Sequence, residues 1–116
     1  MGTAPRPLAE VIRPTTIVES ERLSNALGAR VTLASETFQH TGSFKFRAAY
    51  NLAAKVRERE IIAASSGNFG QALARACSIL GKRCVVVMPH DSVAVKVEAV
   101  RAQSYANPVW SKNPYG

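Results

Sequence analysis

The pattern of apolar and polar positions along the chain is typical of strands in some stretches and of helices in others. A strand-type pattern occurs in three places. Residues 31–36 alternate in polarity and contain β-branched side chains, which is typical of a strand with one buried face. Residues 61–65 and 82–89 contain short apolar runs. Such runs suit parallel strands that are buried on both faces. The sequence therefore predicts strands of a buried parallel sheet.

Apolar residues with helical spacing occur in the stretches outside these strands. Four apolar residues at i, i+3, i+4 and i+7 predict an amphipathic helix from Ser43, its expected cap, to about Arg59. The four are Phe46, Ala49, Tyr50 and Ala53. Ser92 is the expected cap of another helix. Counting that one, further helices are predicted at residues 8–12, 20–28, 71–80 and 92–101.

The order of these elements, with helices alternating with apolar strands, predicts an α/β fold. We expect an open three-layer αβα arrangement with parallel strands. The pattern breaks at Ser104, and residues 104–116 are rich in turn-forming residues. They are interpreted as a tail that does not continue the fold.

Composition adds limits on the class of protein. The chain has 116 residues, one domain's worth, with 47% apolar and 20% charged residues. No apolar run approaches the roughly 18 residues of a membrane span, and residues 1–8 lack the apolar stretch of a signal peptide. These features predict a cytoplasmic protein without a membrane partner. Cys77 and Cys84 are expected to be buried free thiols, and no metal site is expected.

The formal net charge of +7 raises nucleic acid as a partner. The arginines are dispersed, however, and no predicted helix carries a continuous basic stripe. Aromatic and basic residues do not interleave as they do in proteins that bind single strands. The run of alternating charge at residues 57–60 is interpreted as a solvated helix end. Nucleic-acid binding is therefore not expected.

One lysine has an unusual setting. Lys45 stands between Phe44 and Phe46, directly after the turn-forming residues 41–43, at the start of a predicted helix. The helix dipole disfavours an ammonium in the first turn, and burial by apolar neighbours would do the same. A neutral amine is the nucleophile that forms a Schiff base with a carbonyl compound. Lys45 is therefore a candidate nucleophile, whereas His40 is expected to be a solvated loop residue.

A second candidate site is the small-residue turn at residues 65–70, Ser-Ser-Gly-Asn-Phe-Gly. It lies between a predicted strand and a predicted helix. Such a turn directs backbone N–H groups outward at a helix N-terminus, where an anion can bind. The spacing alone is compatible with a phosphate, a carboxylate or a tight connection without a ligand. Only Gly67 and Gly70 are present, so the Gly-x-Gly-x-x-Gly pattern of nucleotide sites is absent.

The two motifs resemble those of the pyridoxal-phosphate enzymes of the tryptophan-synthase-β class, or fold type II. Within that class they are most similar to the threonine/serine dehydratase and serine racemase group. The group's Ser-Phe-Lys-x-Arg-Gly-Ala corresponds to residues 43–49 here, with Ala48 in place of glycine. The group's Ser-x-Gly-Asn corresponds to residues 65–68. The resemblance extends from about Arg13 to about Gln103.

The resemblance implies roles for individual residues. Lys45 would be the catalytic Schiff-base lysine, Phe44 would pack near the ring of pyridoxal 5'-phosphate, and Asn68 would bond the ring hydroxyl. Ser66 would be a further catalytic residue. The substrate carboxylate would lie among Ser65, Ser66, Gly67, Asn68 and Phe69. The group commonly has histidine at the position of Phe69.

The resemblance implies the N-terminal part of a threonine/serine ammonia-lyase, which converts a β-hydroxy amino acid to a 2-keto acid and ammonia. Residues 1–50 would start the large cofactor domain and residues 51–103 the small domain, so the two-domain fold would be incomplete. The glycine-rich loop that holds the cofactor phosphate in this class is expected beyond residues 104–116. The full-length form is expected to be a homo-oligomer acting on a small amino acid.

Three other interpretations stay open. An amino-acid racemase needs a second acid/base, and Ser66 stands where the similar racemases have a serine. A non-catalytic truncated fragment is suggested by the missing phosphate loop and the unusual tail. The least favoured is a basic module that binds nucleotides or nucleic acid.

Overall fold

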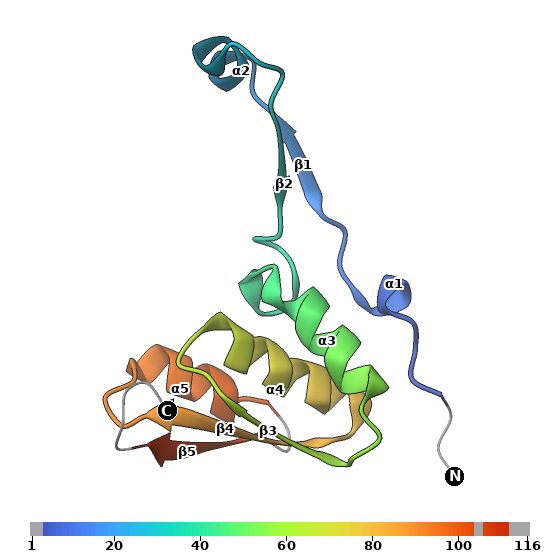
Figure 1. Cartoon of the computed structure of the whole chain (residues 1–116), viewed down its shortest axis with the longest axis vertical. Helices are drawn as coiled ribbons and strands as arrows, with labels where there is room; N and C mark the ends of the chain where they lie inside the picture. The colour runs from blue at the N-terminus through green and yellow to red at the C-terminus, as the bar shows by residue number, and fades with distance from the viewer. Residues whose placement is uncertain (1–3, 104–105, 112–116) are drawn as a thin grey trace.

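The computed structural model describes residues 4–103 and 106–111. These residues form a body, in which helices cover a three-stranded sheet, and an arm that extends from it (Figure 1). The principal extents are 49 × 39 × 20 Å. The helices of the body are α3 (Lys45–Lys55), α4 (Asn68–Leu80) and α5 (Ala94–Arg101). Its strands are β3 (Glu60–Ala64), β4 (Arg83–Pro89) and β5 (Ala106–Ser111).

The sheet has the order β3-β4-β5, and both pairings are parallel. Helices α4 and α5 provide the two crossovers that parallel neighbours require. Along β4 every second side chain is buried, and these are Cys84, Val86 and Met88. The prediction of a parallel sheet in an α/β fold is confirmed.

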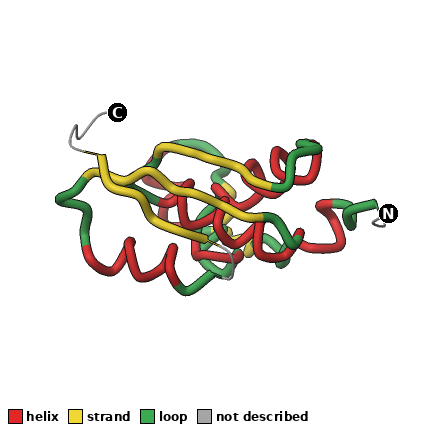
Figure 2. The backbone as a smooth tube through the Cα atoms, turned by 90° about the horizontal axis from the view of Figure 1, so that it is seen from below, coloured by secondary structure: helices red, strands yellow, loops and turns green. Residues whose placement is uncertain are grey.

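The helices lie on one side of this sheet (Figure 2). On the opposite face, Ile62 pairs with Val85 and Val87 pairs with Val109. Ile62 is 65% exposed and Val109 is 45% exposed. The described residues therefore form two of the three expected layers, and the strands are covered on one face instead of two. The apolar runs have a composition that is typical of strands buried on both faces. Strands that helices cover on one face only can have the same composition.

Strand β5 corrects the interpretation of the tail for residues 106–111. These residues pair in parallel with β4, whereas the sequence analysis expected them to leave the fold. Pro108 made the segment look like a turn, but β5 is an edge strand, where a missing N–H is tolerated. The valine and tryptophan that follow it favour extended structure. Residues 104–105 and 112–116 of the predicted tail lie outside the described residues.

The core lies between α3, α4 and the sheet. All four residues of the predicted α3 stripe are buried, with exposures of 0–1%. Small side chains such as Ala49, Ala53, Ala72 and Ala76 lie in the same core, and they allow neighbouring elements to approach closely. Cys77 and Cys84 are buried free thiols, as predicted. A hydrogen bond with Cys77, together with burial, raises the pKa of the Cys84 thiol.

Several helix boundaries differ from the predictions. Helix α3 begins at Lys45 and ends at Lys55, so Ser43 is not its cap and the helix does not reach Arg59. The Ser92 side chain donates to the carbonyl of Pro89 and does not cap α5. Short polar side chains can bond several nearby backbone groups, so sequence alone does not decide which they choose. The expected domain division after residue 50 falls inside α3 and stays a prediction.

The arm is a two-stranded antiparallel ribbon with a helix at its tip (Figure 1). Strand β1 (Thr16–Glu19), which was not predicted, pairs with β2 (Thr32–Ser35), and α2 (Glu21–Leu27) connects them. Ser20 caps α2 by accepting from the Leu23 amide at 3.2 Å. Gly28 ends α2 with a φ of 64°, a conformation that glycine adopts without strain. The expected helix at residues 8–12 is present as α1 (Leu8–Val11).

Candidate functional site

Lys45 begins α3 directly after a short 3₁₀ turn, η1 (His40–Gly42). Its ammonium lies 4.9 Å from the centre of the Phe44 ring, a cation–π distance. Phe44 is 63% exposed and Lys45 is half-buried, whereas Phe46 points into the core. Only one of the two flanking phenylalanines is therefore buried, and the lysine side chain stays accessible to a ligand.

The backbone before Lys45 is held by Gln39, a residue whose role the sequence did not reveal. Gln39 is 2% exposed. Its side-chain oxygen accepts from the Arg13 amide at 2.9 Å, and its side-chain nitrogen donates to the Arg13 carbonyl at 2.8 Å. The same nitrogen donates to Glu36 at 3.1 Å. One buried amide thus ties the incoming strand of the arm to the turn that precedes the lysine.

An ion pair fixes the first turn of α3 from the other side. Arg47 Nε donates to Glu36 Oε2 at 2.8 Å, and the Arg47 guanidinium also donates to the Thr15 hydroxyl at 2.6 Å. The Thr15 hydroxyl bonds Glu36 in turn. The hydrogen bonds from Arg47 and Thr15 lower the pKa of Glu36 to about 2. The arm and the lysine helix are therefore connected by charged as well as neutral hydrogen bonds.

His40 is packed rather than solvated, which corrects the sequence interpretation. Its ring centre lies 4.6 Å from that of Phe46. Its Nε2 is 3.0 Å from the Val11 carbonyl. Burial lowers the pKa of the His40 imidazole, and the nearby Arg13 and Arg75 add to this effect.

The second motif turns from β3 into α4. The Ser65 hydroxyl accepts from the Gly70 amide at 2.9 Å and from the Gly67 amide at 3.3 Å. A Cβ on Gly70 would lie 3.0 Å from Val86 Cγ1 and 3.1 Å from Ser65 Cβ. A side chain at position 70 would therefore force Val86 or Ser65 to shift by a few tenths of an ångström.

The other predicted ligand residues lie at the start of α4, which begins at Asn68 instead of Gln71. Ser66 and Asn68 are exposed, whereas Phe69 packs against the core. Among the described residues, the backbone amides of Asn68 and Phe69 have no hydrogen-bond acceptor. Free amides at the N-terminus of a helix attract an anionic group.

Lys96 of α5 adds a positive charge that the sequence analysis missed. Its ammonium lies 3.7 Å from the point that a Cβ on Gly67 would occupy. The two residues are far apart in the sequence, so only the packing of α5 against α4 reveals their proximity. The turn at Gly67 is therefore flanked by both a helix N-terminus and a cation.

The structure brings the two motifs to the same end of a helix pair. Helices α3 and α4 pack side by side, and both begin at the end of the body from which the arm leaves (Figure 1). A cavity of about 300 Å³ near this end is lined by His40, Thr41 and Gln71, whereas Lys45 and residues 65–69 do not line it. Among the described residues, no group of three or more His, Cys, Asp or Glu side chains could hold a metal ion. No helix in that part of the chain is long and apolar enough to cross a membrane.

Comparison with known proteins identifies relatives of the chain. A family described as pyridoxal-phosphate dependent enzyme matches residues 8–114. L-threo-3-hydroxyaspartate ammonia-lyase of Saccharomyces cerevisiae is 38% identical over 96 residues, which are 79% of this chain and 29% of the relative. L-threonine ammonia-lyase of Thermotoga maritima is 38% identical over 102 residues, which are 84% of this chain and 25% of the relative. The chain therefore spans 25–29% of the length of these two relatives.

A solved structure shares the fold of this chain. The crystal structure of serine racemase from Dictyostelium discoideum superposes with a TM-score of 0.85 at 30% identity. The superposition covers 90% of this chain and 36% of that one.

Proposed function

Because the chain belongs to the family of pyridoxal-phosphate dependent enzymes, we propose that it is the N-terminal part of an ammonia-lyase for a β-hydroxy amino acid. The products would be a 2-keto acid and ammonia. The observation that carries the proposal is the position of Lys45 and of the turn at residues 65–68, at the same end of two packed helices. The similarity to two ammonia-lyases supports the reaction class.

The residues present fit pyridoxal phosphate. The cofactor requires an amine for its aldehyde and a polar partner for its ring hydroxyl. Lys45 is half-buried and accessible, and the Asn68 side chain is exposed without a hydrogen-bond partner among the described residues. Phe44, which is largely exposed beside the Lys45 ammonium, would lie against the ring. When bound, the cofactor supplies an electron-withdrawing ring that stabilises negative charge at the substrate α-carbon.

The chain's own residues would orient the substrate and move protons. The free amides at the start of α4 and the Lys96 ammonium would hold the substrate carboxylate close to Gly67. Lys45 Nζ would then remove the proton from the α-carbon as a general base. The β-hydroxyl would leave with a proton as water, and another water would hydrolyse the released enamine to the 2-keto acid and ammonia. The direction of the carboxylate fixes which face of the α-carbon Lys45 meets.

Borohydride reduction in the presence of pyridoxal phosphate, followed by peptide mapping, tests the proposal. The expected result is a pyridoxyl label on the peptide that contains Lys45, lost in Lys45→Ala and retained in Lys55→Ala. Lys55 is a matched control because it ends the same helix and is exposed. A label distributed over several exposed lysines, with no preference for Lys45, would contradict the proposal.

Amino-acid racemisation is the second candidate. It is favoured by Ser66, which is exposed and has no hydrogen-bond partner among the described residues. Such a hydroxyl is available to exchange a proton with the α-carbon opposite Lys45. Chiral analysis of serine after incubation separates the two reactions. Pyruvate with retained configuration supports the lyase, and D-serine that disappears in Ser66→Ala supports the racemase.

A non-catalytic truncated chain is the third candidate, and it predicts a different result. Such a chain would show no new absorbance band when pyridoxal phosphate is added, because it would not build the cofactor site. A cytoplasmic location and a homo-oligomeric full-length form are further parts of the proposal. Gel filtration of the full-length enzyme tests the second.

A further inference from the structure

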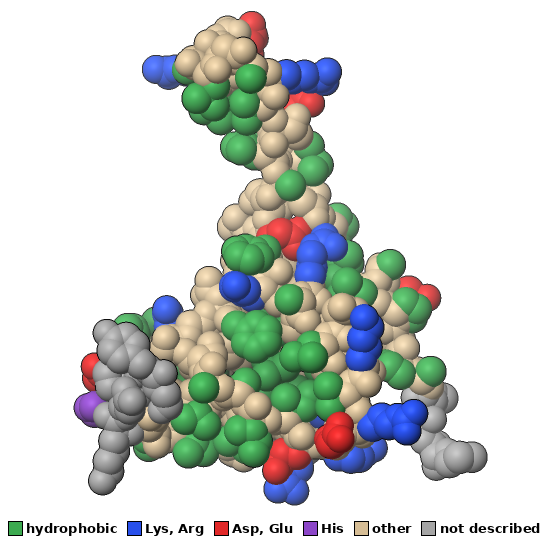
Figure 3. Space-filling model, in the orientation of Figure 1, with side chains coloured by type: hydrophobic (Ala, Val, Ile, Leu, Met, Phe, Trp, Pro, Cys, Tyr) green, Lys and Arg blue, Asp and Glu red, His purple; other side chains and the backbone are tan. Residues whose placement is uncertain are grey.

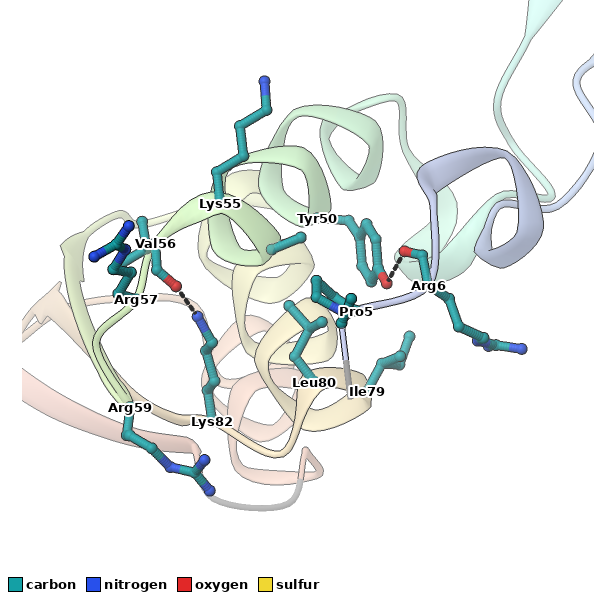
Figure 4. A pocket seen from close by; sticks show the side chains of 12 residues that line it. Pro5, Arg6, Tyr50, Lys55, Val56, Arg57, Arg59, Ile79, Leu80 and Lys82 are labelled. Atoms are coloured by element: carbon teal, nitrogen blue, oxygen red, sulfur yellow. Dashed lines mark hydrogen bonds between the residues drawn. The ribbon is translucent and has the colours of Figure 1, made fainter. Parts of the chain in front are cut away.

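A second pocket lies at the opposite end of α3 from Lys45. Its volume is about 620 Å³, which is within the usual range for sites that bind small molecules. It is formed by the N-terminal segment, the end of α3 with the loop that follows, and the end of α4 with the turn into β4 (Figure 4). The α3 residues that line it begin at Tyr50, five residues after Lys45, so about 7 Å of helix separates the nearest part of this pocket from Lys45.

The lining of the pocket carries positive charges only. The basic residues are Arg6, Lys55, Arg57, Arg59 and Lys82, and no acidic residue lines the pocket. Elsewhere in the described residues, four arginines pair with glutamates: Arg30, Arg47, Arg83 and Arg101. Among the described residues, none of the five basic residues of the pocket has a carboxylate partner. Figure 3 shows basic side chains at this end of the body, close to the N-terminal segment, with acidic side chains between them.

Lys82 differs from the other four because it has a structural role. Its ammonium donates to the carbonyl of Ala53 at 2.7 Å and to the carbonyl of Val56. These carbonyls belong to the end of α3, where the helix dipole is negative and would repel an anion. The ammonium therefore offsets the negative end of α3, whereas the end of α4, which also lines the pocket, carries a partial charge of the same sign. Arg6, Lys55, Arg57 and Arg59 stay free for a ligand.

The inner wall of the pocket is apolar and anchored. Ala54, Ile79 and Leu80 line it, and each packs against the core. The Tyr50 hydroxyl donates to the carbonyl of Arg6 at 2.7 Å, which holds the N-terminal segment across the pocket. In Figure 4, Arg57 and Arg59 lie on one side of the hollow and Arg6 lies on the other, with Lys82 between them. In the same view the Arg6 and Lys55 side chains extend away from the hollow, so the free cations stand at its rim, around a fixed apolar wall.

We propose that this pocket binds a small phosphate-bearing anion with at least two negative charges. Guanidinium groups bind phosphate through two parallel hydrogen bonds, and three of the four free cations are arginines. A polyphosphate group carries several anionic groups and can contact more of these cations than a single phosphate can. The pocket and Lys45 lie towards opposite ends of α3. The pocket is therefore separate from the proposed catalytic end, although both belong to the same helix.

Isothermal titration of the full chain with inorganic tripolyphosphate, without pyridoxal phosphate, tests the proposal. We expect saturable binding of one equivalent, and at least tenfold weaker binding of inorganic phosphate. Arg57→Ala with Arg59→Ala should weaken tripolyphosphate binding about tenfold or more, since hydrogen bonds to charged groups are among the strongest. Arg57→Lys with Arg59→Lys should recover part of this loss, which separates loss of charge from loss of structure.

The matched control is Arg22→Ala with Arg30→Ala, which removes the same charge from exposed residues of the arm. It should change the dissociation constant less than twofold. Equal weakening by the two double variants would mean non-specific attraction to the net charge of the chain and would overturn the proposal. Absence of saturable tripolyphosphate binding, or binding of polyglutamate alone, would also overturn it.

Discussion

The body and the arm are stabilised by different kinds of interaction. In the body, side chains of α3, α4, α5 and the sheet share one apolar core. In the arm, none of the residues of β1, α2 or β2 is buried, and Ile17, Leu27 and Leu33 are 60%, 63% and 46% exposed. Polar contacts of Gln39 and Arg47 connect the arm to the body. Apolar burial therefore stabilises the body that carries the site, whereas hydrogen bonds orient the turn that precedes Lys45.

The largest expected difference between the two regions concerns a buried leucine. Leu73→Ala removes a side chain of α4 with 0% exposure and should destabilise the fold by about 2–5 kcal/mol. Leu27→Ala, in the exposed arm helix, should change the stability by about 0.5 kcal/mol or less. Urea unfolding followed by circular dichroism measures both. Similar losses for the two variants would contradict the division into a packed body and an unburied arm.

A pair of glycine substitutions provides a smaller and sharper comparison. Gly70→Ala places a Cβ 3.0 Å from Val86 and should cost about 1–3 kcal/mol by overpacking. Gly28→Ala meets no atom within 4 Å, so its cost of about 1 kcal/mol comes only from the left-handed backbone at the end of α2. Gly28→Ala should therefore lower the unfolding midpoint less than Gly70→Ala does. A larger midpoint shift for Gly28→Ala than for Gly70→Ala would contradict the account.

The junction between arm and body should respond to pH. The pKa of Glu36 is lowered from 4.5 to about 2 in the folded chain. Because the folded pKa is the lower one, the ionised group contributes fully to stability above about pH 4.5, and the contribution is lost as the pH falls towards 2. Thermal unfolding at pH 5 and pH 3 should show a smaller pH dependence in Glu36→Gln than in the parent chain. Equal pH dependence in both would mean that Arg47 and Thr15 do not hold Glu36 as described.

Much of the body could be predicted because its residues carry periodic signals. The stripe of α3, the apolar β4 and the glycine that ends α4 each follow from local spacing. The boundaries were harder, since Ser43 and Ser92 had several backbone partners within reach. Strand β1 has only four residues and contributes no buried side chain, so it has no strong pattern to detect. Strand β5 was hidden by Pro108, whose position at a sheet edge depends on the tertiary fold.

The same distinction applies to the candidate site. Lys45 and the Ser-Ser-Gly-Asn turn are local motifs, and the sequence located both. Lys96 lies beside Gly67, and Gln39 bonds the backbone of Arg13. These contacts join residues that are distant in the sequence, so periodicity and spacing contain no information about them. The basic pocket likewise collects charges from three separate segments that looked dispersed along the chain.

The central claim is that the two motifs form one site, and amide NMR of the ¹⁵N-labelled chain tests it most directly. Pyridoxal phosphate should shift the amide signals of Lys45 and Gly67 and the side-chain signal of Asn68 together, with one saturation curve. The signal of Gly28, which ends the arm helix α2, should not move. The shifts of Gly67 and Asn68 should disappear in Lys45→Ala. Saturable shifts at Lys45 with unchanged Gly67 and Asn68 signals would contradict the claim that the turn at α4 belongs to the same site.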